Sequence, residues 1–370
     1  MRTKAAVLYT PNEPIVIEEI DVASPRRGEA LIRVLSAGVC HSEVHVIRGR
    51  RPAPLPAVLG HEGAGIVEDV GPDVTAVKPG DHVVLLWRTP CGRCHFCATG
   101  RPALCEESAK AGSAGTMPDG TIRFSKDGQP IYHFIGPSCF SQYTVIHENA
   151  LVPIPNDFPM PVAAIMGCGV ITGVGAVVNS AKVPPGSTVA VFGVGGVGLS
   201  AVMGANLVNA SQIIAVDLNP RKLDWAMALG ASHTVNASEC DSVKAILELT
   251  DGRGVDFAFE AIGQTAVVEQ AFDATARGGM TVMIGSPRPE AQIRVPARIM
   301  FGQERVLRGS YYGSTRPYED IPWLVRLYRS GRLPLDKLIS RHYPLDEYNE
   351  AVRALEAGEV ARSVLDIMPM

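Results

Sequence analysis

The chain has 370 residues, of which 46% are hydrophobic and 19% are charged, so it is long enough to bury a large core and to form two domains. Lysine and arginine number 34 against 38 aspartate and glutamate residues, a formal net charge of -4. Because nucleic-acid-binding proteins carry a basic excess, this balance argues against nucleic acid as a partner. The N-terminal stretch MRTKAAVLYTPNEP has no apolar signal core, which favours a soluble cytoplasmic protein with reduced thiols and no membrane association.

The first third of the chain is punctuated by glycine and proline and contains short β-prone runs. Residues 30–34, 65–70 and 82–87 are examples. Short strands separated by turn residues are typical of a barrel-like β domain. We therefore expect a β-rich N-terminal domain.

Four cysteines near the end of these runs have the spacing C-x2-C-x2-C-x7-C, namely Cys91, Cys94, Cys97 and Cys105. A short lobe with this spacing can surround one tetrahedral Zn²⁺ with four thiolates, which leaves no open position and predicts a structural site. Nucleic-acid-binding zinc ribbons, redox pairs and disulfides are the alternatives. The charge balance argues against the first of these, and a reducing compartment argues against disulfides.

The most apolar stretch, residues 162–178, approaches the length of a membrane span. It contains four glycines and is soon followed by Pro184-Pro185-Gly186. We therefore predict a buried, glycine-rich helix here rather than a membrane span.

From Ser187 onward, apolar strands alternate with helical segments. This alternation predicts a parallel sheet covered by helices on both faces, that is, a doubly wound α/β fold. The tail from about Tyr312 contains amphipathic helical segments but no complete sheet, so we expect it to pack back on the first domain. The strand MTVMIG, together with the loop after it, could pair with its copy in a second subunit.

The first strand of this alternating region runs into a G-x-G-x-x-G turn that opens a helix, and the candidate cofactor-binding residues of the turn are Gly193, Gly195, Gly196, Val197 and Gly198. Such glycines allow a tight turn and close approach of the backbone to a pyrophosphate at the helix N-terminus. Asp217 follows Gly198 by 19 residues, at the end of the next strand. A carboxylate there accepts hydrogen bonds from the ribose hydroxyls and repels a 2′-phosphate. NAD is thus favoured over NADP, although Lys222 lies close enough to offset part of the repulsion.

Several segments together resemble the zinc-dependent medium-chain alcohol dehydrogenases, and most closely the vertebrate-type branch and its bacterial relatives. The matching segments are GVCHSEVH (38–45), GHEGAGIVEDVG (60–71), the four-cysteine lobe, GTMPDGTIRF (115–124), FSQYTV (140–145), GCGVITGVGA (167–176) and FGVGGVG (192–198). The resemblance implies a GroES-like catalytic domain at residues 1–169 and 312–370, with its structural-zinc lobe near 91–105, and a Rossmann NAD-binding domain at residues 170–311. It also implies an NAD-dependent enzyme with two Zn²⁺ per chain that forms a homodimer or a homotetramer.

The same resemblance implies Cys40, His61 and Cys168 as ligands of a catalytic zinc. Two thiolates and one imidazole leave the fourth tetrahedral position open, and Zn²⁺ lowers the pKa of a hydroxyl bound there. Glu62 matches the family's acid beside the metal, and its alternative role is only to orient the loop. Without the family match, each ligand would be interpreted as an ordinary buried cysteine or histidine.

The family pattern further implies a route for the proton and contacts for the cofactor. The proton of the alcohol would pass to Ser42 and then, through the ribose hydroxyl of the nicotinamide half, to His45. His45, with an unperturbed pKa of about 6.5, would be the terminal base near the surface. His41 and Arg362 would hold the pyrophosphate. Several relatives have arginine in place of His41, and a neutral imidazole grips a pyrophosphate less firmly.

Matched positions imply a substrate pocket above the zinc, formed by Trp87, Phe134, Ile135, Ser286 and Tyr311. The aromatic content of this pocket favours the reversible oxidation of a primary alcohol with an apolar or aromatic chain to the aldehyde, because such pockets discriminate by shape.

Three alternatives stay open. Relatives that oxidise the glutathione adduct of formaldehyde, an S-hydroxymethyl thiol, carry an acid and an arginine where this chain has Arg51 and Ala109, so the match to them is poor. Arg50 and Arg51 could still recognise another anionic thiol or acid. A bacterial subgroup keeps its nicotinamide permanently bound, and a non-catalytic dinucleotide-binding relative would hold the lobe zinc alone.

Overall fold

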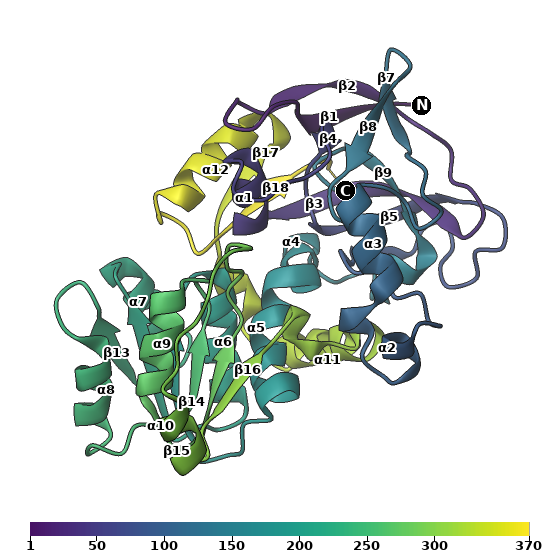
Figure 1. Ribbon diagram of the computed structural model, residues 1–370. Helices are drawn as coiled ribbons and strands as arrows, with labels where there is room; N and C mark the ends of the chain where they lie inside the picture. The colour runs from purple at the N-terminus through teal and green to yellow at the C-terminus, as the bar shows by residue number, and fades with distance from the viewer. Residues whose placement is uncertain (370) are drawn as a thin grey trace. The chain divides into compact units, whose positions relative to one another are not determined.

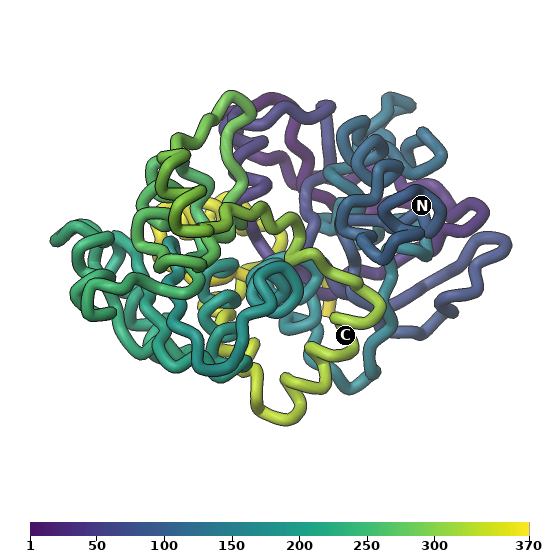
Figure 2. Tube along the Cα trace, turned by 60° about the horizontal axis from the view of Figure 1, so that its bottom comes forward, coloured from purple at the N-terminus to yellow at the C-terminus, as the bar shows by residue number. Residues whose placement is uncertain are grey.

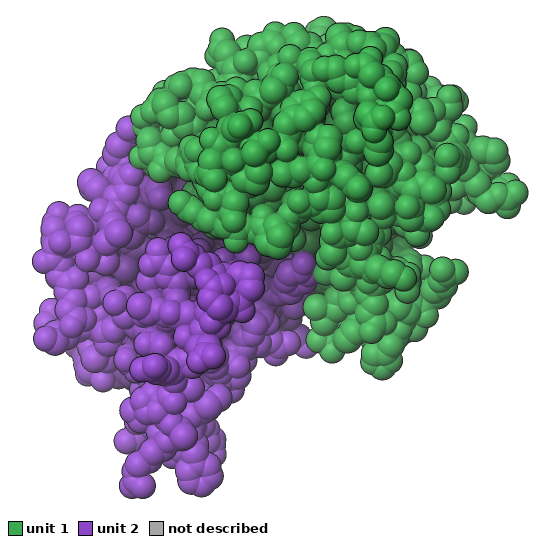
Figure 3. All heavy atoms as spheres, turned by 45° about the horizontal axis from the view of Figure 1, so that its top comes forward, with its two compact units in different colours: residues 1–168, 316–329, 335–370 green, residues 169–315, 330–334 purple. Residues whose placement is uncertain are grey.

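The structure is a computed structural model that describes residues 1–369. The chain forms two compact units, which Figure 3 shows in different colours. Unit 1 consists of Met1–Cys168, Arg316–Arg329 and Leu335–Met370, and unit 2 consists of Gly169–Thr315 and Ser330–Pro334. Each unit has its own sheets.

Unit 1 contains a closed β-barrel of short strands (Figure 1). In order around the barrel, these strands are β1 (Arg2–Leu8), β2 (Val16–Val22), β7 (Phe124–Lys126), β8 (Gln129–His133) and β4 (Ala57–Val58). Their side chains form an apolar core cluster that includes Val7, Ile20 and Phe124. The predicted β-rich N-terminal domain is confirmed.

A larger sheet in unit 1 carries most of the candidate site. Its strands follow the order β10 (Leu151–Ile154), β6 (His82–Leu85), β5 (Glu62–Val70), β3 (Glu29–Val39), β18 (Arg362–Asp366) and β17 (Ile339–Pro344), and β9 (Tyr143–His147) also pairs with β3. β18 belongs to the C-terminal tail and pairs antiparallel with β3, so that Val364 lies opposite Gly38 (Figure 1, yellow beside purple). The tail therefore packs on the first domain, as predicted, and adds strands to its sheet.

The helices of unit 1 lie in the connections between these strands. They are α1 (His41–Ile47), α2 (His95–Ala98), α3 (Glu106–Ala114), α4 (Met160–Ile165), α11 (Pro317–Arg329) and α12 (Tyr348–Glu356). α1 follows β3 at once, and Cys40 is its N-cap residue. The end of β3 thus delivers Cys40 to the start of a helix.

A single long helix runs from Met160 to Ala181 and is drawn in teal in Figure 2. It continues α4 through a π-helical turn at Met166–Val170, α5 (Ile171–Gly175) and a second π-helical segment at Ala176–Ala181. Its length and composition alone would suit a membrane span, but 83% of its most apolar window is buried in the protein, as in the core helix of a soluble protein. The buried, glycine-rich helix predicted for residues 162–178 is confirmed.

The sheet of unit 2 has six strands, all parallel. In spatial order they are β13 (His233–Asn236), β12 (Gln212–Asp217), β11 (Thr188–Phe192), β14 (Val255–Glu260), β15 (Thr275–Met283) and β16 (Val306–Gly309). Counted along the chain this order is 3-2-1-4-5-6, which is the doubly wound dinucleotide-binding arrangement. Its helices are α6 (Gly196–Leu207), α7 (Pro220–Ala228), α8 (Ser242–Leu249), α9 (Thr265–Asp273) and α10 (Ala297–Gly302). The predicted Rossmann sheet is confirmed.

One prediction about this sheet is wrong. The strand MTVMIG lies within and just beyond β15, which pairs with β14 on one side and with β16 on the other. It therefore has no free edge for a second copy of the chain, and the edge strand on this side of the sheet is β16. Strands of a parallel sheet are buried on both faces and apolar throughout, so their sequence does not distinguish an interior strand from an edge strand.

Candidate metal centres and cofactor site

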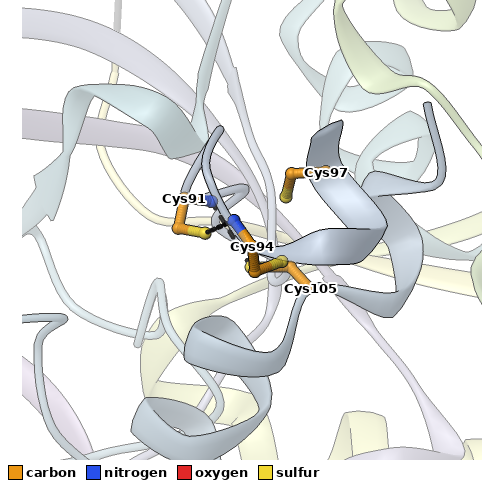
Figure 4. A group of neighbouring side chains, drawn as sticks. All are labelled: Cys91, Cys94, Cys97 and Cys105. Carbon is orange, nitrogen blue, oxygen red and sulfur yellow. Dashed lines mark hydrogen bonds between the residues drawn. The ribbon is translucent and has the colours of Figure 1, made fainter. Parts of the chain in front are cut away.

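The four lobe cysteines come together as the spacing predicts. The sulfur atoms of Cys91, Cys94, Cys97 and Cys105 all lie within 4.8 Å of one another (Figure 4). Backbone N–H groups point at these sulfurs, since Cys94 donates to Cys91 Sγ and Cys91 donates to Cys105 Sγ, each at 3.3 Å. Four thiolates fill a tetrahedral Zn²⁺ site completely, so this site fits a structural ion.

The charges of the lobe thiols are unequal. A backbone hydrogen bond from Cys97 is the main cause that lowers the pKa of Cys94 to about 6. Burial raises the pKa of Cys97 to about 12. A cation that favours thiolates is the group that would allow both sulfurs to be deprotonated at neutral pH.

A second group of possible ligands is fully buried in unit 1. One atom each from Cys40, His61, Glu62 and Cys168 lie within 4.8 Å of one another. Tetrahedral Zn²⁺ with sulfur ligands at about 2.3 Å would have neighbouring ligand atoms about 3.7 Å apart, so the set is compact enough for one ion. Two sulfurs and one imidazole nitrogen are a zinc-type donor set, and they leave one position open.

Sheet pairing explains how these residues meet. β3 pairs antiparallel with β5, and this register places Gly38 opposite Glu62. Cys40, two residues beyond Gly38, is thereby brought to the start of β5, where His61 and Glu62 lie. A Cβ atom on Gly38 would lie 2.4 Å from Glu62 Oε2, so the close approach requires glycine at that position.

Cys168 reaches the same place from the long buried helix. It lies in the π-helical turn Met166–Val170, and such turns are frequent at functional sites. A Cβ atom on the preceding residue, Gly167, would lie 2.5 Å from the carbonyl oxygen of Leu85. The helix can therefore approach the end of β6 closely enough to present Cys168 only because residue 167 is glycine.

Glu43 orients the histidine, and the sequence analysis missed it. Its carboxylate makes a very short hydrogen bond with His61 Nδ1 and also accepts the backbone N–H of Cys40 at 3.2 Å. The other ring nitrogen, Nε2, is therefore the one available to a metal, as in carboxylate–histidine–zinc arrangements. The only signal in the sequence is an acid three residues after Cys40, which by itself indicates a helix capping box.

The buried charges of the cluster influence one another. The neighbouring thiol of Cys168 lowers the pKa of Cys40, while the pKa of Cys168 itself is raised. Burial alone would lower the pKa of His61, but the Glu43 carboxylate and Cys40 outweigh it and raise that pKa. Burial raises the pKa of Glu62 to about 8. The cluster thus contains one thiolate-prone sulfur, which is the form that binds a metal.

Arg362 lies inside this cluster. Its Nη2 atom is 3.2 Å from Glu62 Oε1, and its Nη1 atom donates to the carbonyl oxygen of Val39 at 3.2 Å. The Arg362 side chain is only 5% exposed, and β18 holds it beside β3. Its contact in this structure is therefore an acid, and its predicted contact with a pyrophosphate stays a prediction.

The predicted relay residues lie on α1. Ser42 Oγ is 3.8 Å from Cys40 Sγ, so its hydroxyl borders the metal cluster. His45 follows one helical turn later and is half-buried, whereas His41 at the start of the helix is exposed. Ser42 and His45 are thus both partly exposed, and the proton route through them stays a prediction.

Two of the predicted pocket residues contact the candidate ligand His61. The rings of Trp87 and Phe134 meet the His61 ring edge to face, with centroids at 6.5 and 5.8 Å. Ile135 follows Phe134 directly and has a positive φ of 38°. Ser286 and Tyr311 belong to unit 2 and are both exposed, so their place in the pocket stays a prediction.

The glycine-rich turn of unit 2 has the geometry that a dinucleotide needs. Gly193 has φ of 82°, and a Cβ atom on Gly198 would lie 1.9 Å from the carbonyl oxygen of Gly193, so both positions require glycine. α6 begins at Gly196. Asp217, at the end of β12, accepts the backbone N–H of Val194 at 2.9 Å and that of Asn219 at 3.0 Å. The carboxylate is thereby fixed beside the turn that would receive the cofactor.

The predicted cofactor-binding residues Gly195, Val197 and Lys222 lie around this turn. Gly195 is the N-cap residue of α6, and Val197 lies in the first turn of that helix. Lys222 lies in the first turn of α7 and is partly exposed.

Comparison with known proteins places the chain in a family. Residues 26–156 match the alcohol dehydrogenase GroES-like domain, and residues 196–330 match the zinc-binding dehydrogenase domain. An S-(hydroxymethyl)glutathione dehydrogenase of Escherichia coli is 42% identical over 99% of this chain and 100% of its own length. The crystal structure of an alcohol dehydrogenase zinc-binding domain protein from Burkholderia ambifaria is similar over 100% of this chain and 100% of its own chain, with a TM-score of 0.96 and 38% identity. A benzyl alcohol dehydrogenase from Acinetobacter calcoaceticus is similar over the same shares of both chains, with a TM-score of 0.95 and 36% identity. The chain therefore belongs to the zinc-dependent medium-chain alcohol dehydrogenases, a family of NAD-dependent enzymes with one catalytic and one structural zinc.

Proposed function

We propose that this enzyme oxidises a primary alcohol with an apolar or aromatic chain to the aldehyde, reversibly and with NAD. The observation that carries the proposal is the buried set of Cys40, His61 and Cys168, with the rings of Trp87 and Phe134 packed on His61. Aromatic rings beside the reacting position suit an aryl substrate, since offset and edge-to-face ring contacts add to the burial of apolar surface. The similarity to a benzyl alcohol dehydrogenase supports the same class of substrate.

In this proposal Cys40, His61 and Cys168 hold the catalytic zinc, and the four lobe cysteines hold the structural zinc. The bound zinc supplies a Lewis acid that lowers the pKa of a hydroxyl, and NAD supplies the hydride acceptor. Glu43 keeps Nε2 of His61 turned toward the cluster. Glu62 and Arg362 offset each other's charge in a dry environment.

The proton of the alcohol leaves through α1. Ser42 is the first acceptor, because its hydroxyl borders the cluster. His45, half-buried and one turn further along the helix, passes the proton toward solvent. His41 and Arg362 contribute positive charge or hydrogen bonds toward the pyrophosphate.

Unit 1 is the catalytic domain in this proposal and unit 2 is the NAD-binding domain. The pyrophosphate lies against the turn that contains Gly193, Gly195 and Gly196, where a helix N-terminus favours negative charge. Asp217 selects NAD because its carboxylate accepts hydrogen bonds from the ribose hydroxyls and repels the 2′-phosphate of NADP. The positive charge of Lys222 offsets part of this repulsion.

A second candidate substrate is the S-hydroxymethyl adduct of an anionic thiol. The 42% identity to an S-(hydroxymethyl)glutathione dehydrogenase favours it. Arg51 also favours it, because this exposed side chain makes no hydrogen bond or ion pair with any other residue in the described range 1–369. Its backbone N–H donates to the carbonyl oxygen of His45 at 3.0 Å, which fixes Arg51 at the turn that follows α1.

A substrate screen that follows NADH absorbance tests both candidates. It compares aliphatic, benzylic and S-hydroxymethyl thiol substrates, with NADP in parallel. We expect the highest kcat/KM with benzylic alcohols and NAD, and an Arg51→Ala variant should leave that value unchanged. A preference for the thiol adduct that Arg51→Ala abolishes would replace the first candidate with the second. NADH that copurifies and survives dialysis would indicate a permanently bound nicotinamide.

The assembly in this proposal is a homodimer or homotetramer of a cytoplasmic enzyme. The edge strand β16 and Phe301 on α10, whose side chain is 88% exposed, support a contact between copies at this end of the unit 2 sheet. Light scattering of a Phe301→Ser variant tests this surface, with Met227→Ser, 46% exposed on α7, as the matched control. A Phe301→Ser protein with the mass of the wild type would exclude this contact.

A further inference from the structure

Trp87, the pocket wall beside His61, has a second partner that no part of the mechanism uses. The guanidinium carbon of Arg88 lies 5.4 Å from the centroid of the Trp87 ring. The same indole meets the His61 ring at 6.5 Å. One aromatic side chain therefore contacts both a candidate metal ligand and an arginine.

Arg88 in turn is bound to the four-cysteine lobe. Its Nε atom donates to the carbonyl oxygen of Ala103 at 3.3 Å. Ala103 is 3% exposed and lies in the short 3-10 turn Pro102–Leu104, which leads directly into the lobe ligand Cys105. The next residue, Thr89, makes a second hydrogen bond to the lobe, in which its backbone N–H donates to Ser108 Oγ at 2.9 Å. Residues 88 and 89 are thus attached to both sides of Cys105.

The backbone around Trp87 is fixed independently. The N–H of Leu86 donates to the carbonyl oxygen of Ala150 at 2.8 Å. Gly136 lies against the main chain of Trp87, since a Cβ atom there would be 3.3 Å from the Trp87 carbonyl oxygen. With the backbone held in this way, the orientation of the indole depends on its side-chain contacts, which include those with His61 and Arg88.

From these contacts we propose that Arg88 is a positioning residue that couples the orientation of Trp87 to the four-cysteine lobe, so that the metal in the lobe influences substrate selectivity. The Arg88 guanidinium lies over the Trp87 ring while its Nε atom donates to the lobe, and a lysine side chain with its single terminal ammonium cannot make both contacts at the same time. When Cys105 binds a metal in the lobe, the carbonyl group of Ala103 is held in place. Arg88, which donates to that carbonyl oxygen, then holds the indole of Trp87 in one orientation. This inference rests on the proposed alcohol dehydrogenase activity for its kinetic consequence only.

The first test follows Trp87 by fluorescence in the metal-loaded enzyme. Trp225 and Trp323, the other two tryptophans of the chain, are replaced by phenylalanine so that emission reports Trp87 alone. Arg88→Met should shift the emission maximum and increase quenching by acrylamide, with the zinc content unchanged. Arg101→Met is the matched control, because Arg101 lies 5.5 Å from the Phe96 ring in the same lobe without contacting Trp87. Emission unchanged in Arg88→Met, or changed equally in Arg101→Met, would overturn the inference.

The second test measures selectivity. The ratio of kcat/KM for a bulky benzylic alcohol to that for ethanol should change about fivefold in Arg88→Met, which corresponds to one cation–π contact, with the change mainly in KM. Arg88→Lys should restore less than half of it. Cys94→Ser should alter the ratio in the same direction in the wild type but not in Arg88→Met. Additive effects of the two changes would contradict the coupling. A parent enzyme without alcohol activity would refute the proposed function instead, while the fluorescence test would still decide the role of Arg88.

Discussion

The two groups of metal ligands in this chain are built in opposite ways. The lobe cysteines Cys91, Cys94 and Cys97 are partly exposed and near one another in sequence. The sulfurs of Cys91 and Cys105 accept hydrogen bonds from neighbouring backbone N–H groups. Cys40 and Cys168 are buried and distant in sequence, and they meet through sheet pairing and a π-helical turn. The lobe needs only its own loop, whereas the buried cluster needs the whole domain.

This difference separates the roles of the two groups. Four sulfurs around a lobe leave no position for a substrate, so a metal there takes no direct part in the reaction and contributes mainly stability. The buried cluster offers three strong ligands and an acid that is itself paired with Arg362, and two aromatic rings pack on its histidine. Such a site suits a reaction from which water is excluded. Changes in the two groups should therefore affect different measurements.

The largest expected effect is on activity, from Cys40→Ser. Loss of one sulfur ligand should lower kcat/KM at least about a thousandfold, because the charge stabilisation supplied by the ion is worth several kcal/mol. Metal analysis should find one zinc per chain instead of two. The melting temperature should change less than it does in Cys94→Ser. Wild-type turnover in Cys40→Ser would show that the catalytic metal is held elsewhere.

Cys94→Ser should produce the converse result. It should remove the other zinc and lower the melting temperature by roughly 10 °C, since structural zinc binding contributes several kcal/mol to folding. The catalytic zinc should remain, and kcat should fall by less than about tenfold. Cys240, exposed and outside both clusters, provides the control, because Cys240→Ser should change neither zinc content nor melting temperature.

His133 is a buried histidine outside both groups of metal ligands, in contrast to the candidate ligand His61. Its effect on stability should therefore come from protonation alone. Burial, and then the charge of Arg123, lower the pKa of His133 from 6.5 to about 4. The unfolded chain therefore binds more protons than the folded chain between these values, so stability should fall as pH decreases from about 6.5 to about 4. Over this whole pH range, protonation of His133 should lower the free energy of unfolding by about 3 kcal/mol, at about 1.4 kcal/mol per pKa unit.

Urea unfolding of His133→Asn across this pH range measures the contribution. The variant is expected to be less stable at pH 7 but to lose less stability on acidification. The wild-type protein, measured in parallel, gives the reference slope. If the slope of His133→Asn equals that of the wild type, His133 is not the group that titrates.

The smallest expected effect concerns Glu43. Glu43→Gln keeps the shape of the side chain but removes the charge behind His61, so zinc affinity of the buried cluster should fall by about 10- to 100-fold. Competition with a chelator measures this, and the lobe zinc should be released at the wild-type rate. Glu68→Gln, at an exposed acid paired with Arg33, is the control. Equal zinc release from wild type and Glu43→Gln would remove Glu43 from the site.

The sequence predicted the lobe from spacing alone, because four ligands in a short loop can meet in few ways. It did not predict the buried cluster in that manner. Cys40 and Cys168 are each compatible with ordinary buried packing, and only the family resemblance brought them together with His61. Glu43 was missed because an acid at the third position of a helix is explained equally well by capping.

The fold followed a similar division. Alternation of strands and helices predicted the parallel sheet of unit 2, and the glycines of the turn at Gly193 predicted its cofactor edge. All of these strands are apolar, so their sequences do not indicate which strand lies at the edge of the sheet. Only the structure identifies β16 as an edge strand. Long-range pairing, such as β18 with β3, depends on tertiary packing that no local pattern encodes.

We propose that Cys40, His61 and Cys168 bind one catalytic ion, separate from the metal of the lobe. An anomalous difference map at the zinc absorption edge, from crystals of protein purified without chelators, tests it most directly. We predict two peaks, one among the lobe sulfurs and one in contact with Cys40 Sγ, His61 Nε2 and Cys168 Sγ. A single peak in the lobe of an active enzyme would show that Cys40, His61 and Cys168 do not hold the catalytic ion.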